Sequence, residues 1–420
     1  MVKLDSFIVQ GGKRLKGTVT ISGSKNAALP CLFASLLTDE DCFIENVPEL
    51  RDIKTAIALL VQLGKSVRFE NHRVIVQKDR PLKYQASYDL VRRMRASAVV
   101  MGPLLGRLGR AQVSMPGGCA IGARPINYHL DAFRRLGAEI DIQEGYVKAS
   151  AKNLRGTTIR LPFPSVGATE NILMATSLAS GKTTLLNAAR EPEIQDLVHC
   201  LRSMGADISG EGTSSIVIRG VKNLRGCVHT VIPDRIEAGT FLIAAAISRG
   251  SIRLLRTEPS HILSLIDHLR KAGMQVRVER DVIEAEWKRP LKPMSIETRV
   301  YPGFPTDLQA QWMSLMAVIS GHSRITEKIF ENRFMHAYEL IRMGAKIDID
   351  GHTAHVEGVK NLSGCPLMVS DLRAGAALVL AGLAAKGKTK ILRVYHLDRG
   401  YEHIERKLRG IGARIRRIPQ

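Results

Sequence analysis

Apolar and polar positions along the chain follow one short pattern that recurs. It runs apolar, two polar, apolar, Gly, small, polar, apolar. Its copies are LVQLGKSV (60–67), FRRLGAEI (133–140), LRSMGADI (201–208), LRKAGMQV (269–276), LIRMGAKI (340–347) and LRGIGARI (408–415). Each copy predicts a helix end, a glycine in the left-handed conformation that closes the helix, and then a strand. The copies lie about seventy residues apart, so six repeated units tile the chain.

A second kind of helix recurs between these copies. It is rich in Ala and other small residues, begins after Asp, Ser or Thr, and carries so little polar surface that we expect it to be buried. The segments are 24–37, 165–179, 233–248, 305–320 and 370–385. Each unit therefore holds two helices and about four strands, and three units could build one domain. A division near 230–233 falls between two copies, and we expect the ligand site in the cleft between the domains.

Composition narrows the class of protein. The chain is 45% hydrophobic and 24% charged, a composition that excludes wholesale disorder. Its length of 420 residues exceeds what a single hydrophobic core usually holds. The net charge of +21 favours anionic partners or a solvated basic surface. The six cysteines show no zinc-ligand spacing, so we expect reduced thiols and no metal. Neither a signal peptide nor an apolar run long enough for a membrane span is evident, so we expect a cytoplasmic protein without membrane contact.

The segment SMPGGCAIGARPINYH (114–129) carries the strongest candidate for chemistry. Glycine and proline at this density predict a loop, and its one thiol, Cys119, has Arg124 nearby. A thiol in such a loop is a better candidate for proton transfer than a thiol in an apolar segment. For the other cysteines we expect inert, mostly buried thiols.

Charged residues also stand at several helix starts. Lys25 and Asn26 begin an Ala-rich helix and could bind an anion, but on these residues alone a cap by Ser24 with a solvated lysine is the favoured explanation. Asp234, Asp307 and Asp371 occupy corresponding positions, where capping alone accounts for each carboxylate. Asp234 and Glu237 also have the spacing of a capping box. Arginines in segments that join the repeats could bind phosphate or carboxylate if they cluster: Arg95, Arg190, Arg333 and Arg399.

Motifs along the whole chain resemble one family. SGSKNAALP, RRMRAS, PGGCAIGARP, NAAREPEI, PDRIEAGTFL, FPTDLQAQ, FENRFMH, DLRAGAALVLAG and YHLDRGYE are similar, in order and spacing, to the UDP-N-acetylglucosamine 1-carboxyvinyltransferases. The resemblance implies an α/β protein with the two-domain inside-out α/β barrel, or enolpyruvate transferase fold. That fold has six βαβαββ-type units, three per domain. It also implies an N-terminal domain of residues 22–232 and a C-terminal domain of residues 1–21 plus 233–420, with the active site between them.

The resemblance implies transfer of the enolpyruvyl group of phosphoenolpyruvate to the 3′-hydroxyl of UDP-N-acetylglucosamine, with release of phosphate and without a cofactor. Cys119 would be the general acid and Asp307 the base. Lys25, Arg124 and Arg399 would hold phosphoenolpyruvate, with Arg95 nearby. The remaining substrate-binding residues implied are Asn26, Pro125, Ile126, Asn127, His129, Ser165, Val166, Gly167, Ile329, Arg333, Asp371 and Arg373. Members of the family often have aspartate where this chain has Asn127, which removes a carboxylate from the expected uridine contacts.

Two other functions stay open at this point. A 5-enolpyruvylshikimate-3-phosphate synthase would share the fold and the phosphoenolpyruvate chemistry, but the PGGCAIGARP and FPTDLQAQ motifs argue against it. A basic nucleic-acid-binding repeat protein would explain the charge, and the C-terminal run RKLRGIGARIRRIPQ is basic enough. That run lacks interleaved aromatic residues, so we expect no nucleic-acid partner.

Overall fold

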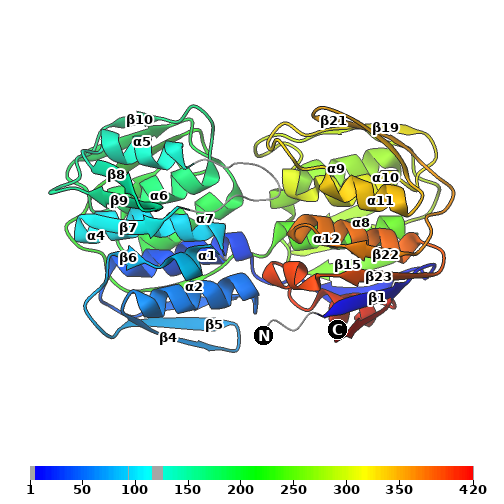
Figure 1. The fold of residues 1–420 in the computed structure, drawn as a ribbon, viewed down its shortest axis with the longest axis horizontal. Helices are drawn as coiled ribbons and strands as arrows, with labels where there is room; N and C mark the ends of the chain where they lie inside the picture. Colours follow the sequence, from blue (N-terminus) through cyan, green and yellow to red (C-terminus); the bar gives the residue numbers. More distant parts are fainter. Residues whose placement is uncertain (1–4, 93, 116–125, 420) are drawn as a thin grey trace. The chain divides into compact units, whose positions relative to one another are not determined.

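The computed structural model describes residues 5–92, 94–115 and 126–419, without the side chain of Arg95. These residues form two compact units (Figure 1). The N-terminal unit contains residues 23–115 and 126–232, and the C-terminal unit contains residues 5–22 and 233–419. The chain thus passes from one unit to the other after Ser22, one residue later than expected, and returns after Ile232. Among the described helices, none has both the length and the apolar character to span a membrane.

Three four-stranded sheets form the outside of the described N-terminal unit (Figure 1). Their strand orders are β14-β3-β5-β4, β6-β7-β9-β8 and β10-β11-β13-β12. The strands are β3 (Cys42–Glu45), β4 (Lys65–Glu70), β5 (Arg73–Lys78), β6 (Gln85–Ala86), β7 (Arg110–Ser114), β8 (Glu139–Gln143), β9 (Tyr146–Ser150), β10 (Thr158–Arg160), β11 (Lys182–Leu186), β12 (Asp207–Ser209), β13 (Ser215–Arg219) and β14 (Cys227–Thr230).

The described C-terminal unit has three sheets of the same kind, with orders β16-β17-β15-β2, β18-β19-β21-β20 and β22-β23-β1-β24. The strands are β1 (Ser6–Gln10), β2 (Lys16–Thr20), β15 (Ser251–Leu255), β16 (Gln275–Glu279), β17 (Val282–Glu286), β18 (Ile296–Glu297), β19 (His322–Thr326), β20 (Lys346–Asp350), β21 (Thr353–Glu357), β22 (Pro366–Met368), β23 (Lys388–Leu392) and β24 (Arg414–Ile418).

Every one of these described sheets has the same pairing: one parallel pair at one edge, followed by two antiparallel pairs. The repeat is therefore structural as well as sequential, and the predicted fold class of six equivalent α/β units is confirmed. Strands β1 and β2 complete two sheets of the C-terminal unit, although they come first in the chain.

The recurring glycine explains how each helix connects to its strand. All six residues of the pattern have positive φ, between 92° and 110°: Gly64, Gly137, Gly205, Gly273, Gly344 and Gly412. A side chain strains this left-handed conformation and glycine does not, so the helix can end there and the chain can turn into the next strand.

The helices are of two kinds, as the sequence predicts. One kind is buried almost all round and fills the inside of each unit: α1 (Lys25–Ala34), α4 (Met101–Leu108) and α6 (Val166–Thr176), then α8 (Arg235–Ile247), α10 (Gln309–Met316) and α12 (Leu372–Ala384). The other kind carries one polar face: α2 (Arg51–Gln62), α5 (Asn127–Arg135) and α7 (Pro192–Ser203), then α9 (Leu263–Ala272), α11 (Met335–Arg342) and α13 (Ile404–Gly410). A further short helix, α3 (Tyr88–Val91), precedes α4. Each unit thus has its own apolar core.

Candidate active site

The three aspartates at the helix starts do not have the same role. Asp234 accepts hydrogen bonds from the backbone N–H groups of Ile236 and Glu237, and Asp371 caps α12 in the same way. The capping interpretation is confirmed for these two. It is wrong for Asp307, which lies in a 3₁₀ turn before α10 and bonds to arginine side chains instead.

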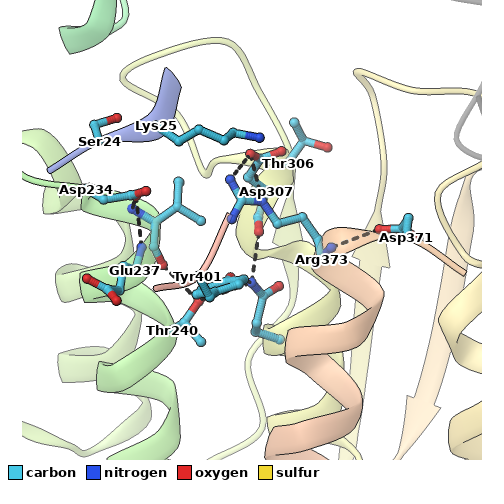
Figure 2. Close-up of polar contacts among 12 residues, drawn as sticks. Ser24, Lys25, Asp234, Glu237, Thr240, Thr306, Asp307, Asp371, Arg373 and Tyr401 are labelled. Carbon is cyan, nitrogen blue, oxygen red and sulfur yellow. Dashed lines mark hydrogen bonds and ion pairs between the residues drawn. The ribbon is translucent and has the colours of Figure 1, made fainter. Parts of the chain in front are cut away.

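Asp307 is held between two guanidinium groups, and Figure 2 shows the one that belongs to Arg373. Arg333 donates from Nη2 to Oδ1 at 2.7 Å, and Arg373 donates from Nε at 3.0 Å and from Nη2 at 2.7 Å to Oδ2. The arginine side chains are 5% and 6% exposed, whereas the carboxylate side chain is 26% exposed. The carboxylate is therefore the member of this cluster that a ligand can reach most readily.

The charges around Asp307 fix its ionisation. Burial alone would raise its pKa, but the positive charges of Arg373 and Arg333, with their hydrogen bonds, hold the pKa well below its usual range. Asp307 is consequently ionised at neutral pH, and the two buried arginines each have a partner.

A second carboxylate holds Arg333 in place indirectly. Glu327 is 1% exposed and accepts hydrogen bonds at 2.8 Å from the hydroxyl groups of Thr306 and Thr298 and from the backbone of Ile329. Thr306 in turn accepts a hydrogen bond from Nη1 of Arg333 at 2.8 Å. Because each link has full hydrogen-bond geometry, Arg333 has little freedom to leave Asp307.

Arg373 is supported by a buried tyrosine that the sequence analysis missed. Its guanidinium carbon lies 5.5 Å from the ring centre of Tyr401. The hydroxyl group of Tyr401 contacts Thr240 at 2.9 Å and accepts a hydrogen bond from Gln311 at 3.1 Å, and Gln311 also donates to the backbone oxygen of Asp307 (Figure 2). Gln311 and Tyr401 stand in the quoted motifs FPTDLQAQ and YHLDRGYE, but their buried positions have no local sequence signal.

Arg373 also has a free donor. Its Nη1 atom is buried and has no hydrogen-bond partner among the described residues. An unpaired guanidinium N–H is costly in a protein interior, so a ligand oxygen at this position would be favourable.

Glu237 does not form the predicted capping box. Its carboxylate accepts hydrogen bonds from Lys407 Nζ and from the backbone N–H of Ser22, both at 2.7 Å, rather than from the backbone of Asp234. Burial raises the pKa of Glu237, and Lys407 opposes that effect. The expectation failed because the backbone N–H of Asp234 donates to the backbone oxygen of Ser22 instead, and Lys407 offers the buried carboxylate a charged partner.

In the N-terminal unit, Lys25 is not solvated. Ser24 caps α1 as predicted, but the Lys25 ammonium group pairs with Asp52 Oδ2 at 3.1 Å, and the two side chains are 12% and 4% exposed. Asn26 follows in the first turn of α1 and is half-buried. The pair presents a fixed cation at the start of a buried helix.

The residues expected to bind uridine and diphosphate include two helix starts. Ser165 caps α6, in which Val166 and Gly167 form the first turn, and Ile126 and Asn127 begin α5. The ring of His129 is buried, and Asn171 donates to its Nδ1 at 2.6 Å. Burial lowers the pKa of His129 to about 4, so the ring is neutral at pH 7. Gly167 lies against this ring, where a Cβ atom would be 3.2 Å from His129 Cε1.

The other predicted site residues are placed as follows. Ile329 and Arg399 are half-buried in the C-terminal unit, Ile329 next to Glu327 and Arg399 at the end of a 3₁₀ turn that begins at Val394. The side chain of Arg95 is not described, and Cys119, Arg124 and Pro125 lie outside the described residues. The C-terminal unit therefore brings together Asp307, Arg333, Arg373 and the Asp371 cap.

Comparisons with known proteins agree with one another. The family model for EPSP synthase (3-phosphoshikimate 1-carboxyvinyltransferase) matches residues 9–408. Proteins named UDP-N-acetylglucosamine 1-carboxyvinyltransferase from Endomicrobium trichonymphae and Geobacter metallireducens are 57% and 52% identical, over 99% of this chain and all of theirs.

Solved structures agree in fold. The enolpyruvyl transferase NikO from Streptomyces tendae superposes with a TM-score of 0.89 at 27% identity, over the whole of both chains. EPSP synthase from Acinetobacter baumannii superposes with a TM-score of 0.75 at 18% identity, over 99% of this chain and all of its own, a likeness of fold alone. The chain belongs to the EPSP synthase family, and within it to the group of the UDP-N-acetylglucosamine 1-carboxyvinyltransferases.

Proposed function

We propose that this chain transfers the enolpyruvyl group of phosphoenolpyruvate to the 3′-hydroxyl of UDP-N-acetylglucosamine and releases phosphate, the first committed step of peptidoglycan synthesis. The observation that carries the proposal is the ionised carboxylate of Asp307 between Arg333 and Arg373, with a donor on Arg373 that no described residue satisfies. An ionised acceptor beside buried cations suits a reaction in which a hydroxyl group loses a proton near anionic substrates.

The reaction has two stages, addition and elimination. In the addition, an acid protonates C3 of phosphoenolpyruvate, positive charge develops at C2, and the sugar oxygen bonds to C2 as its proton leaves. In the elimination, C3 loses a proton, the bond from C2 to the phosphate oxygen breaks, and the double bond forms again. We assign the acid to Cys119, on the sequence motif PGGC, and the acceptor of the hydroxyl proton to Asp307.

The low pKa of Asp307 limits how it can act. A carboxylate with two arginine partners binds a proton weakly, so it first serves as a hydrogen-bond acceptor that orients the sugar hydroxyl. Asp307 takes the proton fully only as the sugar hydroxyl attacks C2. This transfer is easier if a guanidinium group turns from Asp307 toward a substrate phosphate, because the carboxylate then binds a proton more strongly. Arg373, whose Nη1 atom has no partner among the described residues, can bind phosphate without releasing Asp307.

We assign the remaining groups from the family resemblance. Lys25, which Asp52 holds in position, would neutralise the phosphate of phosphoenolpyruvate, with Arg124, Arg399 and Arg95 as further cations. The start of α6, which Ser165 caps, would offer the backbone N–H groups of Val166 and Gly167 to the diphosphate, and Asn26 and Ile329 would line the sugar. We expect Ile126, Asn127 and His129 to contact uridine mainly through their backbone, because the His129 ring is already bonded to Asn171.

Phosphate release measured with the purified chain tests the proposal. Phosphate should appear only when phosphoenolpyruvate and UDP-N-acetylglucosamine are both present, and omission of either should stop it. Shikimate 3-phosphate offered as the acceptor should give no release, whereas release with that acceptor alone would assign the chain to the EPSP synthases. The substrates, and the lack of a membrane-spanning helix among the described residues, fit a cytoplasmic enzyme.

Nucleic-acid binding is less favoured than this reaction. Arg417, in the basic C-terminal run, pairs with Asp398, Glu405 and Asp5 at 2.6–3.2 Å, so part of the charge is neutralised internally. A steep salt dependence of DNA affinity without phosphate release would favour the alternative.

A further inference from the structure

A buried group of sulfur, nitrogen and oxygen donors lies in the N-terminal unit, among residues to which the proposed reaction assigns no role. Cys31 is on α1, Cys200 on α7 and His229 on β14. All three are buried, and one donor atom from each lies within 4.8 Å of the others. These elements belong to one unit, so the group does not depend on how the two units are arranged.

Asp196 contacts two members of this group. It lies one helical turn before Cys200 on α7, with its side chain 2% exposed. Its carboxylate contacts His229 Nε2 at 3.1 Å through Oδ1 and Cys31 Sγ at 3.9 Å through Oδ2. Three donors from three elements therefore lie close to one buried point, and Asp196 contacts two of them.

The donor types and spacings suit one class of metal ion. Two thiolates and an imidazole are ligands that zinc prefers, and they exclude Mg²⁺ and Ca²⁺, which prefer oxygen. Around tetrahedral Zn²⁺, two sulfur ligand atoms are about 3.8 Å apart. The donor atoms of Cys31, Cys200 and His229 lie within 4.8 Å of one another, so shifts of roughly 1 Å would complete the geometry.

The charge balance also permits binding in a buried place. Burial favours the neutral form of both thiols while no metal is bound. Binding a divalent ion to Cys31 and Cys200 forms two metal–sulfur bonds and releases two protons. The net charge of the group is therefore the same before and after binding, and the buried site does not have to accommodate an additional charge.

We propose that Cys31, Cys200 and His229 form a structural site for a soft divalent ion, with Zn²⁺ as the natural occupant and with Asp196 holding His229 in place. This inference is independent of the proposed function and departs from the expectation of no metal. The sequence could not indicate the site, because the ligands come from three separate segments. Two short spacings near these residues are visible in the sequence: Asp196 and Cys200 are four positions apart, and Cys227 and His229 are two positions apart.

Metal content of the full chain is the first test. The chain is purified without chelators or an affinity tag of histidines, and zinc is measured by mass spectrometry. Wild type should hold about one zinc per chain, and Cys200→Ser and His229→Gln should each lose it. Cys119→Ser and Cys365→Ser, which change thiols outside the group, should keep it. Equal zinc in wild type and both ligand variants would overturn the proposal.

Cobalt spectroscopy tests the ligand set directly. Co²⁺ added to the metal-free chain should give the visible bands of a tetrahedral ion and a thiolate charge-transfer band in the near ultraviolet. Both should disappear in Cys31→Ala/Cys200→Ala, an apolar double variant expected to keep the core packed if single variants fail to fold. Absence of these bands in wild type, or a Cys31–Cys200 disulfide found by peptide mapping of the freshly isolated protein, would refute the site.

Discussion

Arg373 donates two hydrogen bonds to one oxygen of Asp307, from Nε at 3.0 Å and from Nη2 at 2.7 Å, while Arg333 takes the other oxygen. This relationship turns a residue in an ordinary capping position into an ionised group with two fixed partners. Local sequence resembles that of Asp234 and Asp371, but the partners differ, and the partners decide the chemistry.

Asp307→Asn should abolish transfer and weaken the fold. Loss of the proton acceptor should lower kcat by roughly 10²–10⁴-fold. Loss of the carboxylate charge leaves Arg333 and Arg373 buried without a counter-ion, which should cost about 3 kcal/mol of unfolding free energy. Steady-state phosphate release and urea denaturation measure the two effects. Asp348→Asn, an exposed aspartate on β20, is the matched control and should change neither. Retained turnover in a folded Asp307→Asn protein would remove Asp307 from the reaction.

The same variant gives a prediction in pH. Because the folded pKa of Asp307 is depressed, its stabilising effect is complete above the unfolded pKa of about 3.9 and is lost as the pH falls below that value. The stability difference between wild type and Asp307→Asn should stay constant from pH 8 to pH 5 and shrink only below about pH 4. Denaturation curves across this range measure it. A difference that already shrinks near pH 6 would contradict the two-arginine account.

Lys25 and Asp52 allow activity and stability to be separated. Lys25→Met removes the cation assigned to phosphoenolpyruvate and leaves Asp52, which is 4% exposed on its side chain, without that ion pair. Activity should fall by at least roughly 100-fold and stability by about 3 kcal/mol. The double variant Lys25→Met/Asp52→Asn should recover most of the stability and none of the activity. If the double variant regains turnover, Lys25 has only a structural role.

Much of the fold could be predicted from the chain because its signals are local. The glycines at 64, 137, 205, 273, 344 and 412 each fix one helix end, and their even spacing is visible without any tertiary information. The small-residue helices are recognisable for the same reason, since lack of a polar face implies burial. Strand pairing such as β1 with β23 and β24 joins the two ends of the chain and came from the family resemblance alone.

The candidate site was less predictable because its contacts are distant in sequence. Asp307 is 26 residues from Arg333 and 66 from Arg373, and no local pattern couples them. The same holds for two other ion pairs. Lys25 was expected to be solvated but pairs with Asp52, and Glu237 was expected to form a capping box but pairs with Lys407. A buried charge takes the strongest partner within reach, and only the fold decides which partner that is.

Cys119 should be the thiol that fosfomycin alkylates. The thiolate would open the epoxide, forming a carbon–sulfur bond, and the released oxygen would take a proton. Peptide mapping by mass spectrometry should find the adduct on Cys119 and not on Cys365, a half-buried thiol in the C-terminal unit. Cys119→Asp should keep a proton donor, turn over and resist the inhibitor, whereas Cys119→Ser should lose most turnover because its hydroxyl is a weak acid. An adduct elsewhere would remove Cys119 from its assigned role.

His129 should make the fold sensitive to mild acid. Asn171 Oδ1 accepts from the backbone N–H of Gly102 at 2.6 Å, which turns its Nδ2 toward His129 and makes the Nδ1 atom of that ring an acceptor. Protonation would place two donors face to face in a buried position. Since burial lowers the folded pKa to about 4 while the unfolded value is about 6.5, the unfolded state takes up the proton first as the pH falls.

The sign of this effect follows from the depressed pKa. Stability from the neutral ring is complete above pH 6.5 and is lost progressively toward pH 4, so lowering the pH from 7 to 5 should cost about 2 kcal/mol through His129 alone. His129→Gln, which keeps an acceptor for Asn171 but does not titrate, should be less stable at pH 7 yet lose about 2 kcal/mol less over the same interval. His355→Gln, an exposed histidine on β21, should follow the wild-type slope. Denaturant midpoints at pH 7, 6 and 5 measure all three proteins. Parallel slopes for wild type and His129→Gln would mean that the ring gains its proton in the folded state as easily as in the unfolded one, which the hydrogen bond from Asn171 forbids.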